Sequence, residues 1–361
     1  MSKRMQTSEK IVLDKILSTG AEYRASDFHF SSGNPPILRV DGKLIPLTSE
    51  AIITPDFMKG FVNDILDKTQ QEILAEEKEI VFAYTMPNKS RFKISIFYQK
   101  GYLAASLRLI PPQIKSIKEL GLPSIIERFA TLEKGLVIVT GPFGSGRTAT
   151  LVALLQAINK TRAEHMVTIE KPIEYLYTNN KSIIEQREVG RDTRSFAQAL
   201  RTASHEDVDV IYVSEMEEAS VVEAVLNAAE SSRLVFTAMN TDAVLRTIEK
   251  IISFFPEEKQ DQVRLQLASV IEGIVSQRLL SRVGGGRIAV AEVMVPNDAV
   301  RAVIREGAIY QINNILQTSR EEGMISLDRS LAELVKTGEI LVDDALANAV
   351  DKYNLKAMIR T

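Results

Sequence analysis

The chain has 361 residues, a formal net charge of −3 and no cysteine, so two domains are the default expectation and disulfides, zinc–thiolate sites and cysteine nucleophiles are excluded. The slightly acidic charge balance argues against a protein that binds and moves along nucleic acid, because such proteins usually have an excess of basic residues. No apolar run is long enough to span a bilayer and the N-terminus lacks the apolar core of a signal peptide, which predicts a cytoplasmic protein.

The first 112 residues predict a small α+β domain. Apolar spacing predicts a short helix over 11–17 and one long helical stretch over 51–77. Alternating patterns predict strands at 27–30, 37–40, 43–45, 79–85, 91–98 and 102–109. Asp41-Gly42 is a strong hairpin signal between the second and third of these strands. Pro111-Pro112 ends the domain, because proline continues neither a ladder nor a helix, and a linker over 113–134 follows.

From residue 135 onward, apolar strands alternate with helical stretches. This pattern is typical of a parallel sheet covered by helices. Strands are predicted at 136–140, 166–170, 210–214 and 234–238. From 299 to 361 the pattern is mostly helical. The sequence therefore predicts an α/β core over 135–298 and a helical C-terminal region over 299–361.

A glycine-rich segment follows the first strand of this core. Gly141-Pro-Phe-Gly-Ser-Gly-Arg-Thr148 has the Walker A frame G-x-x-x-x-G-K-[ST], and a helix is predicted over 148–160. Such a loop turns its backbone N–H groups towards phosphate, and its Thr hydroxyl would ligate Mg²⁺. The residues expected to bind ATP here are Gly141, Gly144, Ser145, Gly146, Arg147 and Thr148, with Thr148 also on the metal. The alternative is a glycine-rich turn without a ligand.

Arg147 stands where the Walker A motif has lysine. Lysine is a compact charge on a flexible stem, whereas arginine is a larger planar fork, so the exchange is not conservative. The guanidinium could still touch phosphate oxygens, but its bulk should displace the terminal phosphate or the loop. We expect nucleotide binding to survive this change better than efficient hydrolysis.

Two carboxylates are candidates for catalytic roles. Val208-Asp-Val-Ile-Tyr-Val-Ser-Glu215 is an apolar strand with an acid at its end, a Walker B layout that places Glu215 near the metal or its water. Glu170-Lys-Pro-Ile-Glu174 closes the preceding strand, and Glu174 is the candidate for orienting or deprotonating the attacking water. The alternative for Glu215 is a solvated acid that caps a buried strand, and the alternative for Glu174 is a surface acid on a loop.

Basic residues lie on two predicted strands of the first domain. In the strand over 91–98, apolar residues share one face and Lys93 lies on the other, while Arg108 lies on the next strand. One interpretation is a solvated basic face. The other is that Lys93 and Arg108 reach a nucleotide on a neighbouring subunit, as arginine fingers do.

Several longer stretches match one known family over nearly the whole chain. They include Ala25-Ser-Asp-Phe-His-Phe-Ser-Ser-Gly33, Gln186-Arg-Glu-Val-Gly190, Ser276-Gln-Arg-Leu-Leu280, Gly284-Gly-Gly-Arg287 and Ala299-Val-Arg-Ala-Val-Ile-Arg-Glu306. On these motifs the chain resembles the type IV pilus retraction ATPases, the PilT type of secretion ATPase. The last stretch is similar to the retraction-specific A-I-R-N-L-I-R-E segment of that family.

The resemblance implies a fold and an assembly. It implies a PAS-like domain over 1–112 and a RecA-like P-loop core over 135–298, in a hexamer of one chain or mixed with a paralogous motor. ATP and Mg²⁺ would bind between domains, and Lys93 and Arg108 lie where such motors place arginines that act on a neighbouring subunit. The ring would work on an inner-membrane pilus platform protein, at the inner face of the cytoplasmic membrane, in pilus retraction and twitching motility.

The reacting groups depart from the family pattern, although Glu174 and Glu215 are kept. Arg147 replaces the lysine of the loop, and Lys171 replaces the aspartate of the acidic box, which reads I-E-D-P-I-E in the family. Glu217 replaces the arginine of the Walker B box, which reads G-E-M-R-D, and Asn240 replaces the second histidine of the segment T-G-H-L-V-F-G-T-L-H-T, called the His box. They favour a ring subunit with weak or absent hydrolysis. The alternative is a fully active retraction motor that tolerates the arginine. A nucleic-acid translocase of RecA-like build is disfavoured by the acidic balance.

Overall fold

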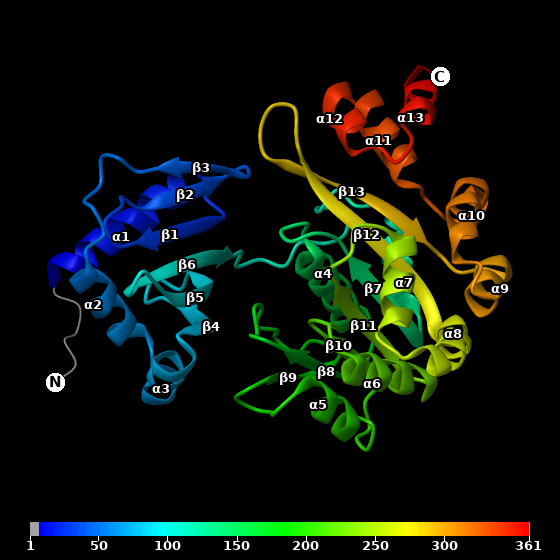
Figure 1. The fold of residues 1–361 in the computed structure, drawn as a ribbon, viewed down its shortest axis with the longest axis horizontal. Helices are drawn as coiled ribbons and strands as arrows, with labels where there is room; N and C mark the ends of the chain where they lie inside the picture. The colour runs from blue at the N-terminus through cyan, green and yellow to red at the C-terminus, as the bar shows by residue number, and fades with distance from the viewer. Residues whose placement is uncertain (1–6, 361) are drawn as a thin grey trace. The chain divides into compact units, whose positions relative to one another are not determined.

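The computed structural model describes residues 7–360, and its backbone forms two compact units (Figure 1). The first unit comprises the chain up to Gln113 together with the short segment Pro172–Tyr175. The second comprises Ile114–Lys171 and Leu176–Thr361. Each unit has its own sheet and its own apolar core.

The first unit is a six-stranded antiparallel sheet in the order β3-β2-β1-β6-β5-β4. Its elements are α1 (Thr7–Glu22), β1 (Asp27–Ser31), β2 (Ile37–Val40), β3 (Lys43–Pro46), α2 (Pro55–Ile65), α3 (Lys68–Glu77), β4 (Glu79–Thr85), β5 (Arg91–Gln99) and β6 (Tyr102–Ile110). Apolar residues of β5 such as Phe92 and Ile94 pack with residues of α1 and α2, such as Ile16 and Phe61. Because side chains alternate along a strand, the polar residues of β5 and β6 are gathered on the opposite face of the sheet.

The single helix expected over 51–77 is wrong, because the structure has two helices there. Leu66 has extended backbone angles between α2 and α3. The Asp67 carboxylate accepts the Gln70 N–H (2.9 Å), and the Gln70 side chain accepts the Asp67 N–H in return (3.1 Å). This reciprocal pair is a capping box, which begins a new helix.

We expect Asp67→Ala to lower the free energy of unfolding by about 1 kcal/mol, because the first turn of α3 loses its side-chain cap. Urea unfolding followed by circular dichroism measures the change. Glu72→Ala is the matched control, since it removes an exposed carboxylate from the same helix and is expected to change stability by less than ~0.5 kcal/mol. Equal effects of the two variants would contradict the role of the capping box.

The second unit is a seven-stranded sheet in the order β13-β12-β7-β11-β10-β8-β9 (Figure 1). Only β13 runs antiparallel to its neighbour; the other pairings are parallel. Its elements are η1 (Ser124–Thr131), β7 (Gly135–Thr140), α4 (Arg147–Thr161), β8 (His165–Glu170), β9 (Ile183–Glu188), α5 (Phe196–Ala203), β10 (Val210–Val213), α6 (Ala219–Glu230), β11 (Leu234–Met239), α7 (Val244–Ser253), α8 (Glu257–Val270), β12 (Ile271–Ser281) and β13 (Arg287–Met294).

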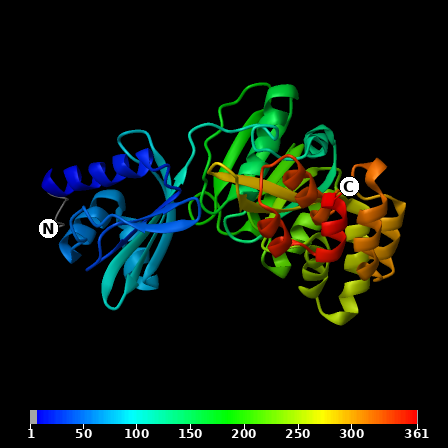
Figure 2. The ribbon, with the colours of Figure 1, turned by 90° about the horizontal axis from the view of Figure 1, so that it is seen from above.

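Helices cover both faces of this sheet (Figure 2). Val137 and Val139 of β7 pack in one cluster with α4 and η1. Leu136 and Ile138 pack in the other cluster, which takes in α5 to α9. All six residues of β7 are buried, so a continuous apolar run is what this strand requires.

The C-terminal region is helical, as expected from residue 299. It contains α9 (Asp298–Arg305), η2 (Ile309–Gln311), α10 (Ile312–Thr318), η3 (Arg320–Glu322), α11 (Leu327–Lys336), α12 (Val342–Asn348) and α13 (Lys352–Arg360). Residues of α11 to α13, including Leu331 and Leu355, form a small separate core with Leu280 and Val290 of the β12–β13 pair.

Candidate functional site: a phosphate loop with an arginine

The glycine-rich segment lies between the end of β7 and the beginning of α4. Gly141, Gly144 and Gly146 have φ angles of 153°, 79° and 91°, which side chains rarely adopt. A Cβ on Gly141 would lie 2.2 Å from the Gln277 carbonyl oxygen. The Ser145 N–H closes the turn by donating to the Pro142 carbonyl (3.1 Å). Glycine is therefore required by both conformation and space at the first position.

The residues of this loop fit a phosphate group. They stand directly before a helix of 15 residues, whose N-terminal N–H groups favour an anion. The buried Ser145 hydroxyl has no hydrogen-bond partner among the described residues. Thr148 is half-buried in the first turn of α4, the place of the hydroxyl that would hold Mg²⁺.

The arginine of the loop is bound to the neighbouring strand. Arg147 Nη1 donates to the Met239 carbonyl oxygen at 2.6 Å. Met239 is the last residue of β11, and the exposed Asn240 follows it. The positive charge of the loop is thus held against the end of β11, beside the position where the resemblance expects a histidine.

A network of threonines holds the chain that follows β11 against the phosphate-loop strand. Thr140 Oγ1 donates to the Thr241 carbonyl (2.8 Å) and accepts the Thr241 N–H (3.1 Å). Thr241 Oγ1 in turn lies 2.6 Å from Thr247 Oγ1 in α7. Sequence inspection missed these residues, because isolated threonines at strand ends carry no motif.

Two charged residues of the β12–β13 pair also bind this segment. Arg278 Nη2 donates to the Asp242 carbonyl (3.1 Å), and the Glu292 carboxylate accepts the Val244 N–H (2.8 Å). Burial raises the pKa of Glu292 above its ordinary value, against the opposing effects of the Val244 N–H and Arg278. The start of α7 is therefore fixed by side chains from a distant part of the sequence.

A cavity of about 530 Å³ opens beside the phosphate loop. It is lined by Pro142, Asn240, Thr241, Asp242, Arg246, Glu249, Lys250 and Ser253. Of the glycine-rich loop, this lining includes Pro142. Asn240 thus faces the same space as the first turn of the loop.

Glu215 lies at the same edge of the sheet as the phosphate loop. It follows β10, and β11 separates β10 from β7. With neighbouring strands about 4.8 Å apart, the strand ends before Glu215 and Gly141 are about 10 Å from each other. Glu215 is exposed, so its carboxylate can meet solvent or a bound ion at this edge.

Glu217, where the sequence resemblance expects an arginine, forms an ion pair. Lys250 Nζ on α7 donates to Glu217 Oε2 at 3.1 Å. The two side chains are 30% and 45% exposed, so the pair is screened by solvent. The Glu217 carboxylate therefore has a local partner of opposite charge.

We expect Glu217→Arg to lower the free energy of unfolding by up to about 1 kcal/mol, because it places two cations together. The double variant Glu217→Arg/Lys250→Glu should recover the loss, since the pair is restored with reversed polarity. A double-mutant cycle of urea midpoints measures the coupling. Additive effects of the two substitutions would show that the pair contributes nothing.

The segment Pro172–Tyr175 carries Glu174 and belongs to the first unit. Lys93 Nζ of β5 donates to Glu174 Oε1 at 3.0 Å. Arg91 holds the backbone of the segment, donating to the carbonyl oxygens of Ile173 and Glu174 (2.7 Å each). Burial, followed by the nearby Glu174 charge, raises the pKa of Tyr175 to about 12. Two predicted site residues, Lys93 and Glu174, are thus brought together by the fold.

The second predicted basic residue of this sheet lies beside the first. Arg108 is the cross-strand partner of Lys93 in β5–β6. Its Nε donates to the Asp27 carboxylate at 2.8 Å, and Asp27 is buried. The same sheet face includes His29, whose pKa burial lowers, with Asp27 opposing that shift. Sequence inspection missed Asp27 and Arg91 as partners.

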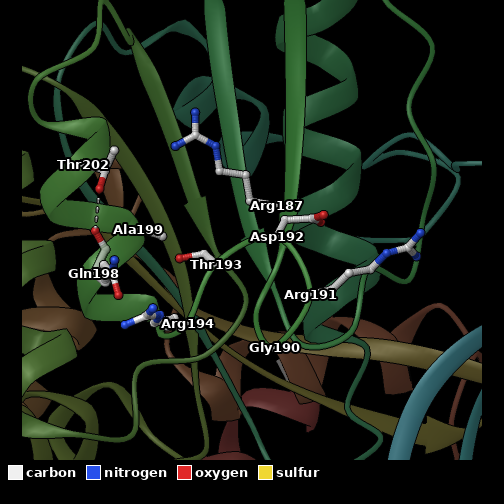
Figure 3. A pocket seen from close by; sticks show the side chains of 9 residues that line it. All are labelled: Arg187, Gly190, Arg191, Asp192, Thr193, Arg194, Gln198, Ala199 and Thr202. Carbon is white, nitrogen blue, oxygen red and sulfur yellow. Dashed lines mark hydrogen bonds between the residues drawn. The ribbon is translucent and has the colours of Figure 1, made fainter. Parts of the chain in front are cut away.

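Another cavity, of about 640 Å³, lies around the loop between β9 and α5 (Figure 3). Its arginines Arg187, Arg191 and Arg194 point in different directions in Figure 3 and do not converge on one anion. Arg187 is paired with Glu206 at 2.8 Å. These arginines therefore do not form one common anion site.

Two kinds of feature were not found in residues 7–360. No group of three or more His, Cys, Asp or Glu side chains there is arranged to hold a metal ion. None of the helices in that range has the length and apolar character needed to cross a membrane.

Comparisons with known proteins identify relatives of the whole chain. The family described as Type II/IV secretion system protein matches residues 3–347. The type IV pilus retraction ATPase PilT of Pseudomonas aeruginosa is 36% identical, covering 93% of this chain and 98% of that protein. The type IV pilus ATPase PilU of the same organism is 33% identical over 96% and 91% of the two chains.

A solved structure of similar fold bears on the architecture. The crystal structure of the pilus retraction motor PilT with bound ADP matches with a TM-score of 0.83 and 38% identity, covering 95% of this chain and 98% of that one. The predicted α/β fold class is thereby confirmed: an N-terminal antiparallel-sheet domain and a largely parallel core.

Proposed function

The chain belongs to the type II/IV secretion system protein family, and we propose that it is a nucleotide-binding subunit of a type IV pilus retraction motor that hydrolyses ATP slowly or not at all. One observation carries the proposal. The glycine frame of the phosphate loop is kept, while its cation is a guanidinium held on Met239 O at 2.6 Å.

Nucleotide binding is supported by the loop geometry and by the ADP named in the similar structure. We assign the phosphates to the N–H groups of Gly144, Gly146 and the first turn of α4. Thr148 and Glu215 would hold Mg²⁺, which would supply charge neutralisation on the phosphates.

Slow hydrolysis is supported by what has been replaced. Removal of one positioned catalytic group typically costs ~10²–10⁴ in rate. Arg147 and Asn240 stand where the family places lysine and histidine, and effects within one site are not additive. Lys171, in place of an aspartate, adds a further cation to the acidic box.

The second candidate is a fully active ATP-hydrolysing retraction motor. It is favoured by the retention of Glu174 and Glu215, with Glu174 positioned by Lys93. Phosphate release from the purified chain with Mg-ATP separates the two. The first proposal expects turnover well below about 1 per second, and turnover at or above that rate would establish the second.

The assembly is also a proposal. We infer a homo-hexamer or a hexamer mixed with a paralogous motor, acting with an inner-membrane pilus platform protein at the inner face of the cytoplasmic membrane. Light scattering of the chain alone and with a retraction ATPase tests the ring. A monomer under both conditions would contradict it.

A further inference from the structure

We propose that Gln277 of β12 is a positioning residue that sets the conformation of the phosphate loop. Its side chain is 1% exposed and both ends of its amide are used. Nε2 donates to the Ser145 carbonyl (2.8 Å), and Oε1 accepts the Thr150 hydroxyl (2.8 Å). One amide therefore joins the loop to the first turn of α4.

The strand register explains why this residue reaches the loop. Ser276 is the Cα partner of Thr140, the last residue of β7. Gln277 therefore follows opposite Gly141, where the two strands cease to pair. Its own carbonyl oxygen lies 2.2 Å from where a Cβ of Gly141 would stand. Backbone and side chain of Gln277 thus pack on the loop from the same side.

The bond to Ser145 has a consequence for phosphate binding. The Ser145 C=O and the Gly146 N–H belong to one planar peptide unit and point in opposite directions when it is trans. Because Gln277 holds the carbonyl towards β12, the Gly146 N–H is aimed away from β12. That N–H is one of the donors expected to face a phosphate group.

Glutamine is suited to this place because its amide is both donor and acceptor. Gln277→Glu keeps the size and the acceptor for Thr150, but removes the donor and sets a carboxylate oxygen against the Ser145 carbonyl. Gln277→Met keeps the approximate length and removes both bonds. The matched control is Gln262→Glu, the same chemical change on an exposed residue of α8.

This inference rests on the proposed nucleotide binding, so it is tested with and without nucleotide. In calorimetric titrations of the full chain with Mg-ADP and Mg-AMP, Gln277→Glu should weaken ADP binding at least about 10-fold. AMP binding should change less, because AMP lacks the β-phosphate that the loop is expected to bind. The ratio of the two dissociation constants should therefore shrink, which a general loss of stability would not produce. Gln262→Glu should leave both constants unchanged.

Hydrogen exchange without nucleotide separates failure of this inference from failure of the proposed function. Peptides covering 141–150 should exchange faster in Gln277→Glu and Gln277→Met than in wild type or Gln262→Glu. If wild type binds no ADP but the loop peptides respond in this way, the function is wrong and the positioning role holds. Should Gln277→Glu not fold, Gln277→Met serves the same measurements. Wild-type exchange and a wild-type ADP/AMP ratio in the folded variants would overturn the inference.

Discussion

Arg147→Lys combined with Asn240→His is expected to raise the rate of ATP hydrolysis about 10²- to 10⁴-fold above that of the wild-type chain. In the structure the guanidinium is held on the Met239 carbonyl at 2.6 Å, beside Asn240. A lysine ammonium is a compact charge on a flexible stem, so it can stay in contact with the phosphate as the phosphate moves. An imidazole at the end of β11 can donate a hydrogen bond to a phosphate oxygen. Phosphate release under saturating Mg-ATP measures the gain.

The single variants and a control define what this gain means. Arg147→Lys alone should restore only part of the rate, because groups in one site do not act additively. Arg194→Lys is the matched control, since it makes the same exchange at an exposed position outside the proposed site and should leave the rate unchanged. A double variant that binds Mg-ADP and still hydrolyses no faster than wild type would place the defect elsewhere.

Gly141→Ala is expected to weaken Mg-ADP binding more than 100-fold and to lower the free energy of unfolding by about 2–4 kcal/mol. The new Cβ would lie 2.2 Å from Gln277 O and 2.5 Å from Ser145 Oγ, and φ is 153°. Backbone must move to relieve the first overlap, because the oxygen belongs to a paired strand. Calorimetric titration and urea unfolding measure the two effects.

Gly284→Ala separates conformational strain from this overlap. Gly284 has a φ of 87° in the turn between β12 and β13, and a Cβ there would meet nothing within 4 Å. This substitution should lower the free energy of unfolding by about 1–2 kcal/mol and leave the Mg-ADP affinity unchanged. Equal losses in the two variants would mean that the close approach of Gln277 to the loop is unimportant.

Most of the core strands could be predicted because they are buried on both faces. The predicted strands at 136–140, 166–170, 210–214 and 234–238 are confirmed as β7, β8, β10 and β11 to within one residue at either end. Their apolar runs leave little choice of structure. Three strands of the same sheet, β9, β12 and β13, were not predicted.

Two of the strands that were not predicted, β9 and β12, contain polar or charged residues within their apolar runs. β9 is an edge strand that mixes Ile183 and Ile184 with charged residues. β12 follows α8 without a turn, and its apolar run is interrupted by Gln277 and Arg278. Both side chains bind loops at the candidate site: Gln277 binds Ser145, and Arg278 binds Asp242. These two polar residues therefore interrupt the apolar pattern of the strand because they make these contacts.

The roles of the site residues stay predictions, but their partners could not be foreseen. The glycine frame and its arginine are visible in the sequence, because such a loop needs those residues at fixed spacing. Pairs such as Lys93 with Glu174 join positions far apart in the chain. No local sequence pattern indicates that two such residues will form a pair.

The sequence by itself determined the α/β class, the family and the phosphate-loop frame, since each follows from local patterns of apolar residues, glycines and short motifs. Tertiary structure alone decided that Arg147 donates to Met239, that Gln277 holds Ser145 and Thr150, and that Glu217 is neutralised by Lys250. These contacts depend on which strands become neighbours in the sheet. Strand order and register are properties of the packed chain as a whole, so no single segment encodes them.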